Sequence, residues 1–98
     1  MNTYVIPTSI AEEMNTNGVV TVYPNPFNTS TTFVINSDEI DAVYTFELYD
    51  VLGKKVNELT NITSKQFNLT RSGLENGIYF YKIYTSEKLI GNGKLIIK

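Results

Sequence analysis

The side chains that most often carry out catalysis are missing from this chain. Its 98 residues include no histidine and no cysteine, which excludes imidazole bases, thiolate nucleophiles, disulfides and His or Cys metal ligands. Carboxylates remain, and Asp38, Glu39 and Asp41 lie close together in the sequence. Such a cluster could bind Ca²⁺ in a loop, and paired carboxylates could hydrolyse a glycoside.

The acidic cluster at residues 38–41 is better explained as a solvated turn between strands. No second acidic cluster completes a Ca²⁺ ligand set, and a glycosidase needs carboxylates on both sides of a substrate cleft. A chain of 98 residues offers little scaffold for such a cleft. We therefore expect no enzyme, no catalytic residue, no bound metal and no cofactor.

Length and charge narrow the class of protein further. A chain of this size forms one domain with one core, and its 42% apolar residues are an ordinary globular share. The net charge of −2 and the pI near 5.0 argue against nucleic acid or an anionic membrane as the principal partner. No apolar stretch could span a bilayer, and Met1–Pro7 lacks the pattern of a signal peptide. A secreted role would need an upstream signal on a longer protein.

The chain divides into a polar start and a β-rich remainder. Residues 1–17 favour a flexible linker from an upstream domain, with a short helix or an edge strand through Tyr4–Ile6 as the alternatives. Residues 18–98 are expected to form the domain, an all-β antiparallel sandwich of about seven strands without a long helix. The expected strands are Val19–Tyr23, Thr31–Asn36, Val43–Asp50, Lys54–Leu59, Lys65–Leu69, Ile78–Thr85 and Lys88–Ile97.

Two strands indicate which faces are buried. Along residues 44–48, apolar residues alternate with Thr45 and Glu47, so the face that carries Thr45 and Glu47 is expected to be wet. Along Ile78–Tyr84 both faces are apolar or aromatic, which fits a central strand whose second face is covered by long side chains or another chain. The side chains expected in the core are Tyr79, Tyr81 and Ile83, although the opposite phase is nearly as defensible.

Two turns have specific chemistry. In Asp50–Gly53 the glycine can adopt positive φ and close a bulged hairpin. In Gly77-Ile78-Tyr79 a tyrosine follows a glycine turn at the start of a strand, which is similar to the tyrosine corner of immunoglobulin-like sandwiches. The Tyr79 hydroxyl would then return to the upstream backbone.

The Pro24–Phe27 string, the final strand and the aromatic content each allow more than one interpretation. Pro24-Asn25-Pro26-Phe27 is either a rigid strand exit with Phe27 in the core or a preformed recognition surface. The final strand could be recognised through its edge, or Lys94 and Lys98 could protect it from aggregation. The 7 tyrosines and 5 phenylalanines allow a carbohydrate-binding or adhesive sandwich, although tryptophan is absent.

Four strings together resemble, in order and spacing, the C-terminal sorting domain of the type IX (Por) secretion system. They are Val22–Phe27, Leu48–Val56, Leu74–Phe80 and Gly93–Lys98, and the resemblance covers about residues 19–98. Each string is loose by itself, but their order argues against coincidence. Ile10–Glu13 also resembles the linker that often precedes such domains.

The resemblance implies an immunoglobulin-like β-sandwich that is an address rather than a catalyst. Such a domain is covalently linked to a larger passenger in Bacteroidetes and related bacteria. In the periplasm of a Gram-negative cell, the secretion machinery recognises the domain and guides the passenger through the outer-membrane translocon. A sortase-like protease commonly removes the domain and attaches the passenger to the cell surface. The expected location is therefore the periplasm in transit, then the cell surface or the medium.

Carried onto this sequence, the resemblance implies a set of signal residues. They are Pro24, Asn25, Pro26 and Phe27 in the first motif, Gly53, Gly77 and Tyr79 at the turns, and Gly93, Lys94, Leu95, Ile96, Ile97 and Lys98 in the terminal element expected to engage the machinery. Asn28-Thr29 stands where many relatives have Asn-Pro, which predicts a less rigid turn. An isolated domain is also expected to dimerise through its edge strands.

Overall fold

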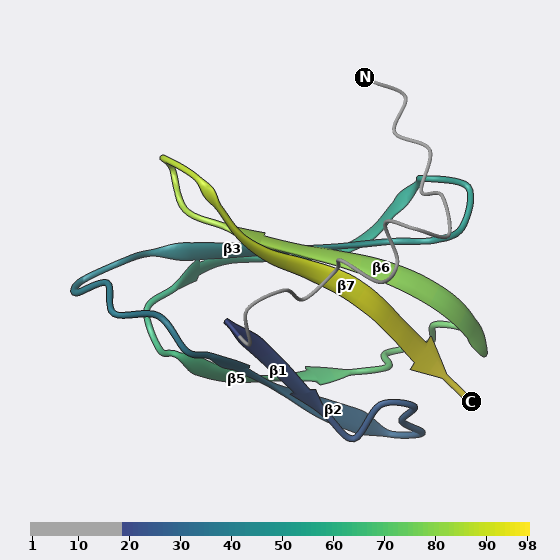
Figure 1. Cartoon of the computed structure of the whole chain (residues 1–98). Helices are drawn as coiled ribbons and strands as arrows, with labels where there is room; N and C mark the ends of the chain where they lie inside the picture. The colour runs from purple at the N-terminus through teal and green to yellow at the C-terminus, as the bar shows by residue number, and fades with distance from the viewer. Residues whose placement is uncertain (1–18) are drawn as a thin grey trace.

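The computed structural model describes residues 19–98, which form two antiparallel sheets packed face to face (Figure 1). The strands are β1 (Val20–Tyr23), β2 (Ser30–Ile35), β3 (Tyr44–Tyr49), β4 (Lys55–Ile62), β5 (Gln66–Thr70), β6 (Gly77–Tyr84) and β7 (Leu89–Ile97). One sheet has the order β1-β2-β5 and the other β4-β3-β6-β7. The predicted seven-stranded sandwich is confirmed, whereas the expected linker at 1–17 lies outside the described residues. None of the described residues belongs to a helix that is long and apolar enough to cross a membrane.

Alternating residues of both sheets fill the space between them. The buried residues of β3 and β6 include Tyr44, Phe46, Leu48, Tyr79, Tyr81 and Ile83, as predicted. Phe33 of β2 meets the rings of Phe46 and Tyr81 edge-on, with centroids 4.9 and 5.0 Å apart. Edge-to-face contacts of this kind add to the burial energy, so the aromatic cluster fixes how the two sheets face each other.

The predicted strand bounds agree with the structure to within one residue at each end, except in β4. We expected β4 to end at Leu59, but it continues to Ile62, which pairs with Tyr44 and is buried. A register shift between Tyr44 and Phe46 and the positive φ of Asn61 (57°) carry the strand through an irregular stretch. The residues after Leu59 show no alternation of apolar and polar side chains, so the predicted strand ended three residues too early.

The β3–β4 turn has the predicted geometry. Gly53 has a φ of 86°, and its N–H donates to the Asp50 carbonyl at 3.0 Å. The Asp50 carboxylate accepts hydrogen bonds from the Leu52 and Lys54 N–H groups, both at 2.9 Å. Gly53 therefore closes a bulged hairpin in a conformation that L-residues rarely adopt.

Strand direction gathers the predicted motifs at one end of the sandwich. Because all neighbouring strands are antiparallel, the connections 24–29, 50–54 and 71–76 and the end of β7 lie at the same end. We call this the motif end; Figure 1 shows the C-terminus beside the β1–β2 connection there. The connections 36–43, 63–65 and 85–88 lie at the opposite end.

Candidate recognition site at the C-terminal strand

The Pro24–Phe27 segment carries the chain from one sheet to the other. β1 pairs with β2, whereas Phe27 forms a parallel bridge with Ile97 of β7. The Phe27 N–H donates to the Ile96 carbonyl and the Lys98 N–H donates to the Phe27 carbonyl, both at 2.9 Å. The peptide bonds before both prolines are cis. Neither proline has an N–H for the β1–β2 ladder, so the chain leaves that ladder here and joins the edge of β7.

The Asn25 side chain replaces a backbone amide at this edge. Its Nδ2 donates to the Lys94 carbonyl and its Oδ1 accepts from the Ile96 N–H, both at 3.0 Å. A side-chain amide offers a donor and an acceptor, as a peptide group does. Asn25 therefore supplies the donor that the flanking prolines lack, and it joins segments 69 and 71 positions apart in the sequence.

Phe27 and Asn28 complete the cover over the end of β7. The Phe27 side chain is only 3% exposed and belongs to the core cluster, so its predicted core role is confirmed. The Asn28 Nδ2 donates to the Lys98 carbonyl at 3.0 Å. The outer edge of β7 is thus occupied from Lys94 to Lys98, and pairing with a further strand there, one of our sequence-based interpretations, is not available in the folded domain.

Arg71, the single arginine of the chain, joins this segment to the loop before β6. Its Nη1 donates to the Asn28 carbonyl at 3.2 Å, and its Nε and Nη2 donate to the Leu74 carbonyl at 3.1 and 3.0 Å. The Arg71 N–H also donates to the Thr29 carbonyl at 3.0 Å. Arg71 was not among the predicted signal residues. A lone arginine directly after a strand is a usable signal, because its planar guanidinium can bind several carbonyls at once.

The predicted tyrosine corner is confirmed at the start of β6. The Tyr79 hydroxyl donates to the Glu75 carbonyl at 2.7 Å. Gly77, the first residue of β6, pairs with Ile97 of β7. This turn therefore also lies against the C-terminal strand.

The side chains of the terminal strand alternate between core and surface. Those that are buried are Leu95 and Ile97, and those that are exposed or half-buried are Lys94, Ile96 and Lys98. Gly93 lies under Tyr81, and a Cβ at Gly93 would come within 2.7 Å of the Tyr81 hydroxyl oxygen. Glycine at this position is explained by packing inside the domain.

Gly53 is the predicted signal residue that the structure leaves apart from the others. It lies at the motif end, but the β3–β4 turn is separated from β7 by β6 in the sheet order β4-β3-β6-β7. The structure therefore brings together the Pro24–Phe27 segment, Gly77, Tyr79 and the terminal strand. The Gly53 turn lies toward the other edge of the same sheet, away from β7.

The outer face of the larger sheet carries Glu47, whose side chain was predicted to be exposed to solvent. Glu47 is only 8% exposed, and the hydroxyls of Tyr49 and Tyr84 donate to its two oxygens at 2.5 and 2.6 Å. Burial raises the pKa of Glu47, but these hydrogen bonds and the charges of Lys55 and Lys82 outweigh it, so the pKa lies below its ordinary value. The prediction of a wet Glu47 was wrong because the two tyrosines lie across it.

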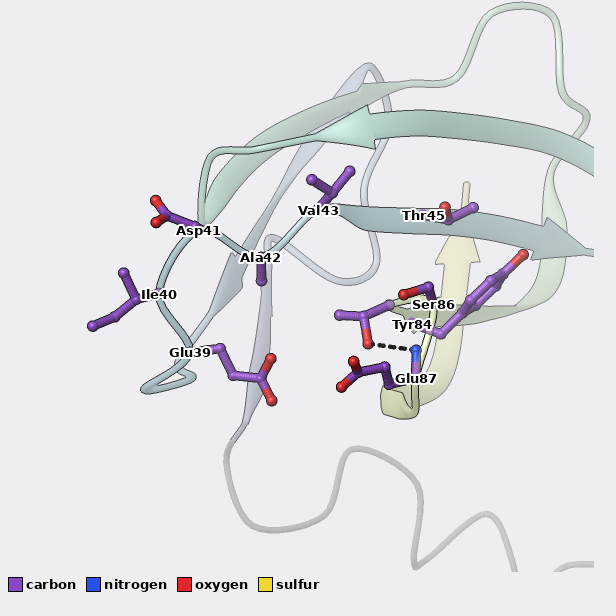
Figure 2. Close-up of a pocket in the computed structure, with 10 residues that line it drawn as sticks. Glu39, Ile40, Asp41, Ala42, Val43, Thr45, Tyr84, Ser86 and Glu87 are labelled. Atoms are coloured by element: carbon purple, nitrogen blue, oxygen red, sulfur yellow. Dashed lines mark hydrogen bonds between the residues drawn. The ribbon is translucent and has the colours of Figure 1, made fainter.

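The opposite end of the sandwich has an open hollow between the 36–43 loop and the 85–88 turn (Figure 2). Glu39 and Glu87 direct their carboxylates toward it, while Ile40 and Asp41 point away. The Lys88 Nζ lies 2.6 Å from the Glu39 carboxylate. Within residues 19–98, no three acidic side chains are grouped so that they could hold a metal ion. The acidic cluster is a turn with one ion pair.

Solved structures similar to the domain include those of two bacterial proteins. A DUF3244 family protein with an immunoglobulin-like β-sandwich fold from Bacteroides vulgatus ATCC 8482 has a TM-score of 0.63 at 16% identity, over 82% of this chain and 85% of that one. Dimeric latent PorU from Porphyromonas gingivalis has a TM-score of 0.60 at 25% identity, over 80% of this chain and 9% of that one. The first likeness shows the fold, and the second relates this chain to a small part of PorU.

A comparison with curated proteins found no significant match to the sequence. A comparison with protein families found that residues 21–98 match the secretion system C-terminal sorting domain. The matched residues include the whole Pro24–Phe27 segment and all of β7. The chain therefore belongs to the family of C-terminal sorting domains of the type IX secretion system.

Proposed function

We propose that the motif end is the part of this sorting domain that the secretion machinery reads. Sorting domains of this system interact with that machinery and direct export across the outer membrane of a Bacteroidetes bacterium; they are signals and not catalysts. The observation that carries the proposal is the contact between Pro24–Asn28 and Lys94–Lys98. Two strings at opposite ends of the domain sequence form one hydrogen-bonded unit.

We also propose how the rest of the chain serves export. Residues 1–17 link the domain, residues 18–98, to an upstream passenger that passes through the translocon. A sortase-like protease then cuts upstream of Val19 and attaches the passenger to the cell surface. Support comes from the direction of β1: it starts at the opposite end of the sandwich and runs toward the motif end. The machinery could therefore hold the motif end while the protease acts at the other end.

Dimerisation of the isolated domain is proposed through edges other than the end of β7. The strand orders leave β1, β5 and β4 as outer strands of the two sheets, together with the part of β7 before Lys94. Light scattering at high concentration tests this: a dimer supports edge pairing, and a monomer at all concentrations rejects it.

The alternative role, a carbohydrate-binding or adhesive sandwich, gains no support from the described aromatic residues. Most of their rings pack in the core, and Tyr23 is the one that is more than half exposed in residues 19–98. The hydroxyls of Tyr49 and Tyr84 are bonded to Glu47. These side chains form no exposed aromatic row on which a sugar could stack.

The experiment for the proposed function is export of a fluorescent reporter with an N-terminal signal peptide and residues 1–98 at its C-terminus. The fusion is produced in a host with a type IX system and in a translocon mutant of that host. Fluorescence at the surface or in the medium of the competent host alone supports the proposal. Periplasmic retention in both strains would contradict it and would favour a binding module instead.

A further inference from the structure

The terminal strand offers few groups to a partner, which limits how it can be read. The outer edge of its last residues is occupied by Asn25, Phe27 and Asn28. The side chains of Leu95 and Ile97 are buried in the core. What remains for recognition is the face of β7 that points away from the core.

That face continues onto the neighbouring strand β6. Ile96 lies directly opposite Ile78, and Lys94 lies opposite Phe80, in the antiparallel register of β6 and β7. Ile78 is 44% exposed, and Phe80 and Ile96 are half-buried. Within residues 19–98, no other element packs over this side of the sheet (Figure 1). The apolar second face of β6, noted in the sequence, therefore has no cover at the motif end.

The charge at this place indicates what kind of surface could cover it. Lys55 and Lys82 both lie beside the Glu47 carboxylate, at 3.5 and 4.0 Å. Lys94 has no carboxylate within salt-bridge distance among the described residues. Two copies of the domain that paired through this face would bring lysines together, which costs free energy. Charge complementarity thus favours an acidic partner over a second copy.

We infer that Ile78, Phe80, Lys94 and Ile96, here called the outward patch, form the docking surface for a protein of the secretion machinery. The partner presents an apolar surface with a carboxylate opposite the Lys94 amine. Apolar side chains bury area against it, and the lysine adds specificity and association rate. The inference rests on the proposed function, because it names the surface through which the motif end is read.

The test uses the reporter fusion with residues 1–98 in the host that has a type IX system. Lys94→Glu and Ile96→Ser are compared with Lys65→Glu and Leu89→Ser, which make matching changes at exposed positions at the opposite end of the sandwich. We expect each patch variant to lower surface fluorescence about tenfold, and each control to leave it unchanged. Thermal unfolding of the purified variants checks that all four fold as the parent does.

The outcomes separate failure of this inference from failure of the proposed function. If the parent fusion is exported and the patch variants are exported equally well, the patch is not the docking surface although the domain is a signal. If the parent itself stays in the periplasm, the proposed function fails. If light scattering shows a dimer that Ile96→Ser and Lys94→Glu both dissociate, a second copy covers the patch and the inference is overturned. Restoration of Lys94→Glu export by an acidic-to-lysine change in a machinery protein would support it directly.

Discussion

The two ends of the sandwich are built in different ways. At the motif end, hydrogen bonds join Asn25 and Asn28 to the last residues of β7 over 69 to 71 sequence positions. At the opposite end, most bonds are local, such as the Glu87 N–H to the Thr85 hydroxyl at 3.2 Å (Figure 2). An ion pair between Glu39 and Lys88 links the 36–43 and 85–88 connections there.

The long-range hydrogen bonds distinguish the motif end, as a candidate recognition site, from the ordinary turns of the opposite end. At the opposite end, the hydroxyls of Ser37 and Thr85 accept hydrogen bonds from backbone N–H groups two or three positions along the chain, and side chains such as Ile40 are exposed. The motif end holds two distant segments together through the buried Phe27 ring, the exposed amides of Asn25 and Asn28 and backbone hydrogen bonds, so a change in one segment should disturb the other. Substitutions should therefore cost much more at the motif end than at the opposite end.

The largest effect is expected for Phe27→Ala, because the ring is buried in the core next to the end of β7. Removing a buried phenylalanine side chain costs about 3–5 kcal/mol. Urea unfolding followed by circular dichroism measures the loss. A loss below about 1 kcal/mol would mean that the segment is not anchored to the core.

Asn25→Ala should cost less, about 0.5–1.5 kcal/mol for each of the two exposed hydrogen bonds that it removes, those to the Lys94 carbonyl and the Ile96 N–H. Hydrogen exchange by NMR should show faster exchange of the Ile96 amide. Asn25→Asp is the matched control, because it keeps an acceptor for Ile96 but has no donor for Lys94. Unchanged Ile96 exchange in Asn25→Ala would refute the assigned bond.

Tyr79→Phe removes one hydrogen bond at the motif end and keeps the ring. The Glu75 carbonyl loses its partner, and the unfolding free energy should fall by about 1 kcal/mol. Denaturant unfolding of the variant and the parent measures the difference. Equal stability would mean that the corner adds nothing beyond packing of the ring.

Glu47→Gln sharpens the comparison with a site that belongs to neither end. The pKa of Glu47 is lowered in the folded protein, so its contribution is present above the unfolded value near 4.5 and is lost as pH falls through the folded pKa. The parent should lose stability below pH 4.5, and Glu47→Gln should lose less over the same range. Identical acid profiles would show that Glu47 does not titrate with folding.

The smallest effect is expected for Glu39→Ala at the opposite end. Its ion pair with Lys88 is largely exposed, and such pairs contribute about 0–1 kcal/mol. Urea unfolding should detect a change within about 0.5 kcal/mol. A loss as large as that of Asn25→Ala would remove the distinction between the two ends.

Local features could be read from the sequence. The buried phase of β3, the positive φ of Gly53 and the Tyr79 corner each depend on a few neighbouring residues, and each was predicted correctly. The extra length of β4 was missed because the residues before Ile62 show no alternation and the strand continues only through pairing with Tyr44.

The contacts of the candidate site could not be predicted in the same way. The motif strings suggested that Pro24–Phe27 and the terminal strand matter, but not that Asn25 bonds to Lys94 and Ile96. Arg71 was missed for the same reason: its contacts with the Asn28 and Thr29 carbonyls depend on how the chain folds back. Glu47 stood on a wet face by alternation, and only the neighbouring strand supplies the Tyr84 that covers it.

The most direct test of the motif end as the sorting signal is export of the reporter fusion with Asn25→Ala beside the fusion with Glu39→Ala. Surface fluorescence is measured in the competent host at equal cellular amounts of the fusions. The structure predicts that Asn25→Ala lowers export and that Glu39→Ala is exported like the parent. Full export of Asn25→Ala, with Ile96 exchange accelerated in the same variant, would contradict the claim that the docked segment and strand are read together.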